Sequence, residues 1–179
     1  MENNNIVHVM LTGGTIDSKY DPENPRVDGN DIDPNVPYEH SIVPEFFKTL
    51  ELDGKFEFTE VYMKDSRDVV PEEIENLLTT IENSQHKQFI VTHGTYTMQD
   101  TAKYLERNLL REDATVVLTG SMFIPHAPED KDTIARLEKI TDARLNLGFA
   151  YAHALNSPPG VYVCIKLEKY TPDNMSKLH

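Results

Sequence analysis

The sequence predicts an α/β fold of three layers, doubly wound, with a mostly parallel sheet between helices. Short apolar segments alternate along the chain with stretches whose apolar residues recur at helical spacing, which is the pattern of this class. The first segment, Ile6–Leu11, is short and partly β-branched and is followed by Gly13 and Gly14. We interpret it as a strand buried on both faces, as in parallel sheets. The length of 179 residues suits one domain with a sizeable core.

The remaining elements follow from local patterns, taken in chain order. Apolar residues at Val43, Phe46 and Leu50 indicate a helix over 42–50, and residues 56–63 alternate as in a strand. Pro71 opens the next helix, because proline suits the first turn and the acids after it complement the helix dipole. Its inward face is spaced i, i+3, i+4, i+7: Ile74, Leu77, Leu78 and Ile81.

The second half of the chain repeats the alternation of strand and helix. Asp142 is expected to cap a helix that runs to about residue 155, where Pro158, Pro159 and Gly160 end the pattern. Its inward residues would be Ala143, Leu147, Ala150 and Ala154. The other elements expected here are a strand over 89–91, a helix over 98–109, a strand over 116–118 and a last strand over 161–165.

Two stretches do not fit this alternation. Residues 17–40 are rich in Asp, Asn and Pro and have no repeating apolar pattern, so we expect a long polar loop. Loops this long in compact domains are often functional, and we predict that residues 17–38 form a mobile lid. Residues 126–140 are charged and are expected to form a loop with some helix.

Composition excludes several classes of function. The net charge of −13 disfavours binding to nucleic acid and to anionic membranes. Cys164 is the single cysteine of the sequence, which excludes a disulfide within the chain. No apolar run approaches the roughly 18 residues that span a bilayer, and the first residues lack the features of a signal peptide. We therefore expect a cytoplasmic, single-domain protein.

Glycine and hydroxyl side chains are concentrated where the predicted strands end. These turns are Thr12–Ile16, Thr92–Thr97 and Thr119–Ser121. Ligands of open α/β sheets bind at the carboxyl ends of the strands, so the turns suit a threonine nucleophile with backbone amides around an oxyanion. Taken singly, each turn fits ordinary helix capping by Thr and Ser better than a site, but three such turns on successive strand ends favour a site.

Cofactor and metal motifs are missing from the sequence. The segment Gly13–Lys19 lacks the glycine that precedes the lysine of a phosphate-binding loop, and no dinucleotide fingerprint is present. The seven histidines are scattered, so no metal site and no cofactor are predicted. His93 stands at a strand end, where we expect its ring to bind backbone.

The strand-end turns carry a family resemblance. Thr12–Ile16 (TGGTI) and Thr92–Met98 (THGTYTM) resemble the two signature motifs of bacterial-type L-asparaginases. Asp65–Asp68 resembles the family's substrate-binding loop, and Val117–Met122 and Asp142–Leu147 resemble its later segments. The resemblance covers residues 5–179 but only the family's amino-terminal domain. It implies that domain's fold and a chain like the short single-domain relatives, without the second domain.

The resemblance also implies roles for individual residues. Thr15 would be the nucleophile, assisted by Tyr20 in the polar loop, and Thr95 and Lys177 would form a second catalytic pair. The substrate would contact Gly14, Ser66, Arg67, Gly94 and Tyr96, with Ser66 binding its α-carboxylate. The family relatives assemble into oligomers, so a homodimer or higher homo-oligomer is expected.

Two residues depart from the family pattern. Tyr96 stands where the family has an aspartate that holds the α-ammonium group of the substrate, and a neutral phenol supplies no such charge. Arg67 adds positive charge near the expected carboxylate site.

The departures leave three functional hypotheses. The first is an amidohydrolase that cleaves asparagine or a related small amide and releases ammonia. The second is an inactive or weak relative that binds a small molecule. The third, a flavodoxin- or Rossmann-like nucleotide-binding module, shares the fold class but lacks a phosphate motif.

Overall fold

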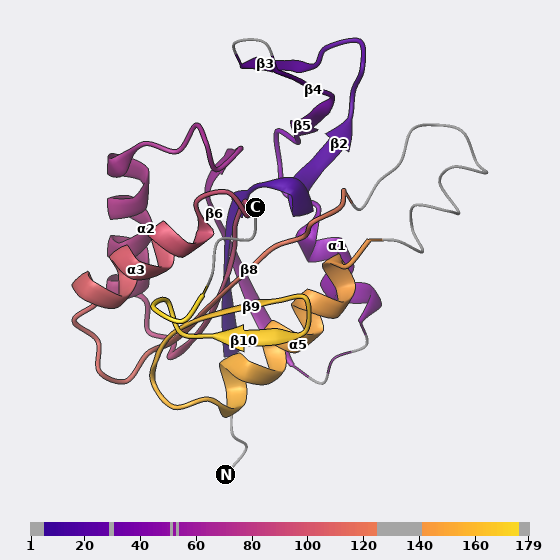
Figure 1. The fold of residues 1–179 in the computed structure, drawn as a ribbon. Coiled ribbons are helices and arrows are strands. Elements are labelled where there is room, and N and C mark those ends of the chain that lie inside the picture. Colours follow the sequence, from indigo (N-terminus) through magenta and orange to yellow (C-terminus); the bar gives the residue numbers. More distant parts are fainter. Residues whose placement is uncertain (1–5, 29–30, 51, 53, 125–140, 176–179) are drawn as a thin grey trace.

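The computed structural model describes residues 6–28, 31–50, 52, 54–124 and 141–175, and it has a parallel sheet at its centre (Figure 1). Within these residues the sheet has six strands in the order β10-β9-β8-β7-β1-β6. The pairs of β6, β1, β7, β8 and β9 are parallel, whereas β10 runs antiparallel to β9. The strands are β1 (Ile6–Gly13), β6 (Lys55–Lys64), β7 (Gln88–Thr92), β8 (Thr115–Thr119), β9 (Gly160–Ile165) and β10 (Glu168–Tyr170).

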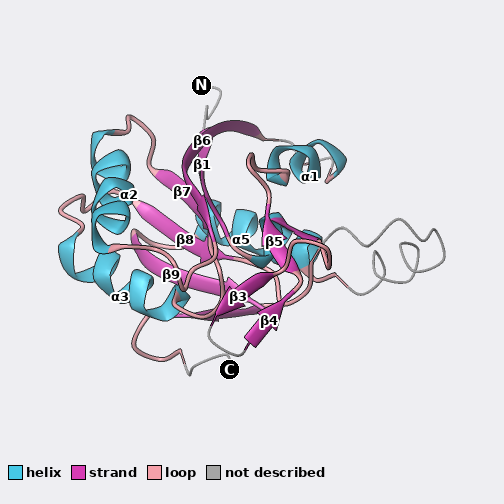
Figure 2. Ribbon diagram, turned by 90° about the horizontal axis from the view of Figure 1, so that it is seen from above, coloured by secondary structure: helices cyan, strands magenta, loops and turns pink. Residues whose placement is uncertain are grey.

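Helices cover both faces of the sheet, as the predicted fold class requires (Figure 2). One face packs against α2 (Pro71–Asn83) and α3 (Met98–Asn108), and the other against α1 (Val43–Thr49) and α5 (Ala143–Asn156). The predicted inward residues of α5 are buried, and Leu77 and Ile81 of α2 are buried as predicted. The three-layer α/β fold is therefore confirmed.

The central strands are buried on both faces. From Val7 to Gly13 every residue of β1 is buried, and successive side chains enter the two different cores. Val9 packs on the α5 side, for example, and Met10 packs on the α2 side. Both faces of such a strand are buried, so its residues do not alternate between polar and apolar. This explains why Ile6–Leu11 is mostly apolar.

Local signals identified most elements, including Asp142 as the N-cap residue of α5, but they missed β10. The Asp142 carboxylate accepts hydrogen bonds from Ser121 Oγ (2.6 Å), Met122 N (3.0 Å) and the side-chain amide of Asn146 in α5 (2.8 Å), but it does not cap the backbone amides of the helix. The Asp142 side chain therefore connects the start of α5 to the turn after β8. The stretch 126–140 lies entirely outside the described residues.

Residues 18–38 form two short pairs of strands, and we call this segment the flap. β2 (Ser18–Tyr20) pairs with β5 (Asn35–Pro37), and β3 (Arg26–Asp28) pairs with β4 (Asp31–Asp33), both antiparallel. The prediction of a loop without regular structure was therefore wrong, because pairing between strands this short leaves no periodicity to detect. The flap projects from the end of the sheet where β1 finishes (Figure 1).

Asp17 anchors the base of the flap. Its buried carboxylate accepts hydrogen bonds from the Ile42 amide (2.8 Å) and the Ser41 hydroxyl (2.9 Å), and its carbonyl accepts one from the Tyr38 amide. Burial raises the pKa of Asp17 to about 6, although the hydrogen bonds from Ile42 and Ser41 oppose this shift. The residue thus ties the start of the flap to the start of α1.

The raised pKa predicts a pH-dependent stability. Because the folded pKa exceeds the unfolded value, the stability that Asp17 contributes is fully present below about pH 4 and is lost as the pH rises through 6. We expect Asp17→Asn to remove this dependence. The measured quantity is the unfolding free energy of the wild type minus that of Asp17→Asn. Between pH 4 and pH 7 this difference should decrease by about 2–3 kcal/mol. Denaturant titrations across this range measure it, and a difference that stays constant with pH would contradict the assignment.

Candidate active site

Three loops meet at the carboxyl ends of β1, β6 and β7. Gly14 has a φ of 82°, and a Cβ atom there would lie 2.5 Å from the Gly94 Cα. A Cβ at Gly94 would in turn lie 2.5 Å from the Ser66 hydroxyl oxygen. Only glycine permits backbones to approach so closely, and a positive φ excludes most other residues at position 14. These two glycines therefore bring the Gly14, Ser66 and Gly94 loops into direct contact.

The two threonines assigned catalytic roles by resemblance follow these glycines directly. Thr15 opens a single 3-10 turn, η1 (Thr15–Asp17), and is half-buried. Thr95 follows Gly94 in the loop between β7 and α3 and is buried. Because Gly14 and Gly94 are in contact, Thr15 and Thr95 lie on neighbouring loops at the same edge of the sheet.

Other strand-end hydroxyls hold the sheet together. Thr12 Oγ1 donates a hydrogen bond to the Thr92 carbonyl, and the Thr12 amide donates to Thr92 Oγ1 (3.3 Å), which joins β1 to β7. Thr119 Oγ1 donates to the Cys164 carbonyl (2.7 Å) and joins β8 to β9. The hydroxyl-rich turns thus contain two kinds of threonine. Thr12, Thr92 and Thr119 lie inside strands and bond to neighbouring strands, whereas Thr15 and Thr95 lie in the loops that follow the strands.

His93 orients the peptide that precedes Thr95. Its Nδ1 lies 2.8 Å from the Gly94 carbonyl oxygen, and its Nε2 lies 3.0 Å from Thr101 Oγ1. A carbonyl only accepts, so Nδ1 carries the proton and Nε2 accepts from Thr101. Burial lowers the pKa of His93, which keeps the ring neutral. The expectation that this ring binds backbone is confirmed.

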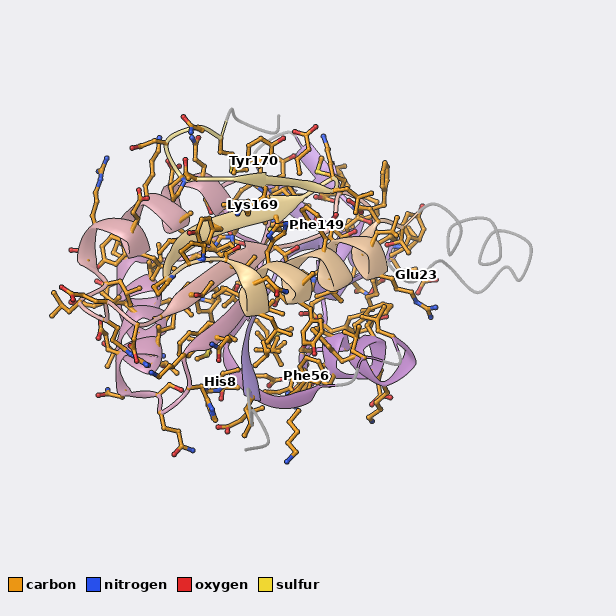
Figure 3. The ribbon with its side chains drawn as sticks, turned by 90° about the horizontal axis from the view of Figure 1, so that it is seen from below. His8, Glu23, Phe56, Phe149, Lys169 and Tyr170 are labelled. Carbon is orange, nitrogen blue, oxygen red and sulfur yellow. The ribbon has the colours of Figure 1, made fainter. Side chains whose placement is uncertain are left out.

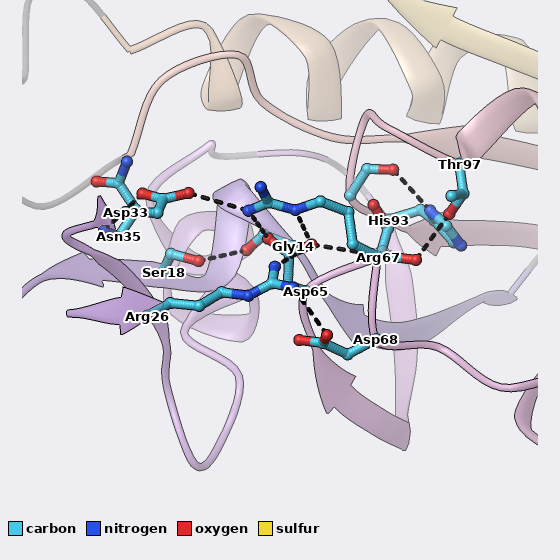
Figure 4. A network of polar contacts seen from close by, with 12 residues as sticks. Gly14, Ser18, Arg26, Asp33, Asn35, Asp65, Arg67, Asp68, His93 and Thr97 are labelled. Atoms are coloured by element: carbon cyan, nitrogen blue, oxygen red, sulfur yellow. Dashed lines mark hydrogen bonds and ion pairs between the residues drawn. The ribbon is translucent and has the colours of Figure 1, made fainter. Parts of the chain in front are cut away.

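Ser66 presents a buried hydroxyl to this junction. The residue is 3% exposed, and its Oγ has no hydrogen-bond partner within the described part of the chain. Its carbonyl accepts a hydrogen bond from Thr97 Oγ1 (3.0 Å), which holds the Ser66 loop against the start of α3 (Figure 4). A buried hydroxyl without a partner costs free energy, so a ligand that bonds to it gains a favourable interaction.

Arg67 is engaged by acidic side chains. Its guanidinium contacts Asp65 (2.9 Å) and Asp33 of the flap (3.0 Å) (Figure 4). It also lies over the ring of Tyr96, 4.5 Å from the ring centroid. Burial alone would raise the pKa of Asp65, but the hydrogen bonds and charge of Arg67, with the charge of Arg26, lower it to about 2. Asp65 is therefore ionised at neutral pH and holds Arg67 in place.

The same ionic network binds the flap to the Ser66 loop. Arg26 of β3 contacts Asp65 (2.9 Å) and Asp68 (2.8 Å), while Arg67 reaches across to Asp33 of β4. The flap is thus joined from both of its inner strands to the loop that carries Ser66 (Figure 4). Asp33, Arg26 and Asp65 were not singled out by sequence analysis for this role. The network gives the predicted lid a set of contacts that would have to break if it opened.

The remaining predicted residues have different positions. Tyr20 lies in β2 of the flap with an exposed side chain, and none of the hydrogen bonds found among the described residues joins it to Thr15. Tyr96 is 54% exposed beside the Ser66 loop. Lys177 lies outside the described residues.

Within the described residues, no helix is long and apolar enough to cross a membrane.

Comparison with known proteins identifies relatives of this architecture. The family model described as the asparaginase N-terminal domain matches residues 6–179. Two solved structures with the same fold are a probable cytoplasmic L-asparaginase from Campylobacter jejuni and the thermostable L-asparaginase from Thermococcus kodakarensis. The first has a TM-score of 0.72 at 21% identity, and the second has 0.70 at 23% identity. Comparison with curated protein sequences gives no match.

The two solved structures are longer than this chain. Each alignment covers 97% of this chain, but only 49% of the Campylobacter protein and 48% of the Thermococcus protein. The chain therefore spans about half the length of these relatives. Because the family match extends over nearly all of its residues, the chain belongs to the asparaginase family, in the region of that family's N-terminal domain.

Proposed function

We propose that this chain is an asparaginase-like amidohydrolase in which Thr15 is the nucleophile. The observation that carries the proposal is the contact of Gly14 with Gly94 and of Gly94 with Ser66. It brings a half-buried threonine hydroxyl to the same edge as a second threonine and a buried serine without a partner. In the proposed reaction Thr15 Oγ attacks the carboxamide carbon and ammonia leaves. Water then hydrolyses the acyl-enzyme to release the acid.

The peptide between Gly94 and Thr95 supports stabilisation of the oxyanion. The Gly94 carbonyl is held by the His93 ring, and the described residues contain no cis peptide. In a trans peptide the Thr95 amide points away from the Gly94 carbonyl, and therefore away from the imidazole that binds it. An amide oriented in advance stabilises developing negative charge without reorganisation. We propose the Thr95 amide as one of the oxyanion donors.

The other assigned residues complete the proposed site. Thr95 and Lys177 would form the second catalytic pair, with the lysine assisting deprotonation of the threonine. Ser66 would bind a carboxylate of the substrate, and its buried hydroxyl without a partner supports this role. Gly14 and Gly94 would let the substrate approach the backbone closely. Tyr20 would assist Thr15 only if the flap rearranged, since its side chain is exposed.

A second candidate is a weak or inactive relative that binds a small molecule. The observation that favours it is Tyr96, which stands where the resemblance places an aspartate and has the Arg67 guanidinium over its ring. An aromatic ring beside a cation is a poor partner for the α-ammonium group of an amino acid. The same observation favours amides without an α-ammonium as substrates, if the chain is active.

Ammonia release from a panel of amides tests the proposed function. The panel contains L-asparagine, L-glutamine and succinamic acid, which is asparagine without its α-amino group. We expect turnover of at least one of them, with succinamic acid favoured over L-asparagine. Saturable binding of these compounds without any ammonia release would favour the second candidate.

We also propose that the chain self-associates, as a homodimer or a higher homo-oligomer. Two large apolar side chains near the start of α5, Phe123 and Leu145, are more than half exposed, which supports burial against another copy. Phe149 and Tyr151 of α5 pack against the core on that face and are half-buried. Sedimentation equilibrium at micromolar concentration should give at least twice the chain mass, and a monomer would contradict this proposal.

A further inference from the structure

Two buried imidazoles and a carboxylate converge at the amino-terminal end of the sheet, the end opposite Thr15. His8 is the third residue of β1 and Glu57 the third residue of β6, and they are register partners in the parallel pair. Register partners project from the same face of a sheet. His86 approaches them from the connection between α2 and β7. Figure 3 shows His8 near the beginning of β1.

The ligating atoms of these three residues lie within reach of one ion. His86 Nε2 is 2.8 Å from one Glu57 oxygen, and His8 Nε2 is 3.8 Å from the other. One such atom from each residue lies within 4.8 Å of the other two. Around a tetrahedral zinc ion with bonds of about 2.0–2.2 Å, ligand atoms stand roughly 3.4 Å apart. Small side-chain rotations would therefore complete three of the four positions.

The surroundings of His8 suit a metal-binding imidazole. Its Nδ1 lies 3.0 Å from the Ser84 hydroxyl, and Thr59 Oγ1 lies 2.8 Å from its Nε2. When Nδ1 donates to Ser84, Nε2 accepts from the Thr59 hydroxyl, and a metal ion would replace that hydroxyl as the partner of Nε2. Ser84 would then hold Nδ1, as hydrogen-bond partners of ligating histidines do.

The cluster opens into a pocket of about 650 Å³. Polar residues of α2, among them Asn76, Thr79 and Asn83, also line this pocket. A fourth ligand from solvent could enter by this route, as in zinc sites that keep one open position.

A simple ion pair does not account for the arrangement. His40 and Glu60 form such a pair on the surface, at 3.0 Å, with one imidazole and one carboxylate. At Glu57 a second imidazole is present, with ring centroids of His8 and His86 5.3 Å apart. His8, Glu57 and His86 thus offer three ligand atoms at one place, which the His40–Glu60 pair does not.

We propose that His8, Glu57 and His86 form a binding site for a divalent transition-metal ion of the zinc class. Two histidines with one carboxylate are a donor set that zinc prefers. The ion would connect β1, β6 and the α2–β7 connection at the end of the sheet remote from Thr15. The site is thus independent of the proposed amidohydrolase activity.

Zinc titration of the full chain, freed of purification tags and treated with chelator, tests the site. We expect one Zn²⁺ per chain by calorimetry and visible absorption bands when Co²⁺ replaces it. Glu57→Gln and His86→Gln should each weaken binding at least about tenfold. His40→Gln is the matched control, because it removes a histidine that is paired with a glutamate outside the cluster. The affinity of this variant for Zn²⁺ should equal that of the wild type.

Thermal unfolding gives a second readout. Zinc should raise the Tm of the wild type and of His40→Gln, but not that of Glu57→Gln, because only a ligand that prefers the folded state stabilises it. The Glu57 side chain is about half exposed, so this variant retains the fold even if His86→Gln does not. Absence of stoichiometric binding, or equal affinity in Glu57→Gln and His40→Gln, would overturn the proposal.

Discussion

Replacing Thr15 by alanine is expected to abolish ammonia release, with a loss of at least about a thousandfold in kcat for the best amide of the panel. The variant removes the hydroxyl proposed to form the acyl-enzyme, and loss of a nucleophile is among the largest effects in mutant kinetics. Thr15→Ser keeps a hydroxyl at the same backbone position, so it should retain part of the activity. The measurement is the initial rate of ammonia release by each variant.

The control for Thr15 is another threonine outside the site. Thr79 is exposed on α2, and Thr79→Ala should leave turnover unchanged. Both alanine variants should keep the circular dichroism of the wild type, because Thr15 is half-buried and the turn it opens is closed by backbone hydrogen bonds. Full activity in Thr15→Ala would show that another group is the nucleophile and would refute the proposed mechanism.

Tyr96→Asp is expected to raise the kcat/KM for L-asparagine by about tenfold or more. An α-ammonium group without an anionic partner in a partly desolvated pocket costs several kcal/mol in order of magnitude, and each 1.4 kcal/mol recovered is tenfold. The new carboxylate lies beside Arg67, which competes for it, so the gain should be smaller than the full cost. Tyr96 is half exposed, and its replacement should not disturb the core.

Substrate comparison separates charge from size at this position. Tyr96→Asn has the shape of the aspartate variant without its charge and should not improve L-asparagine turnover. For succinamic acid, which has no ammonium group, Tyr96→Asp should give no gain. Brisk wild-type hydrolysis of L-asparagine that falls in Tyr96→Asp would show that Tyr96 itself takes part in the reaction. A folded protein inactive in both forms would support the binding-protein alternative.

The order of strands and helices and the inward faces of the helices could be predicted from the sequence. Periodicity is a local property, and Ala143, Leu147, Ala150 and Ala154 are buried on α5 because a helix places them on one side whatever else surrounds it. The strand-end turns were also visible, since glycine and threonine cluster there. The flap was not predicted as strands, because its four strands have three residues each.

The sequence by itself determined the α/β class, the inward residues of the helices and the loops that hold the candidate site. Only the tertiary structure decided which hydroxyls are structural, since Thr12 and Thr15 differ in whether a neighbouring strand accepts their hydrogen bonds. The contact of Arg67 with Asp33 and the convergence of His8, Glu57 and His86 also emerged only there. The physical reason is that strand register and loop packing bring together residues 29 to 78 positions apart, and no local pattern records those distances.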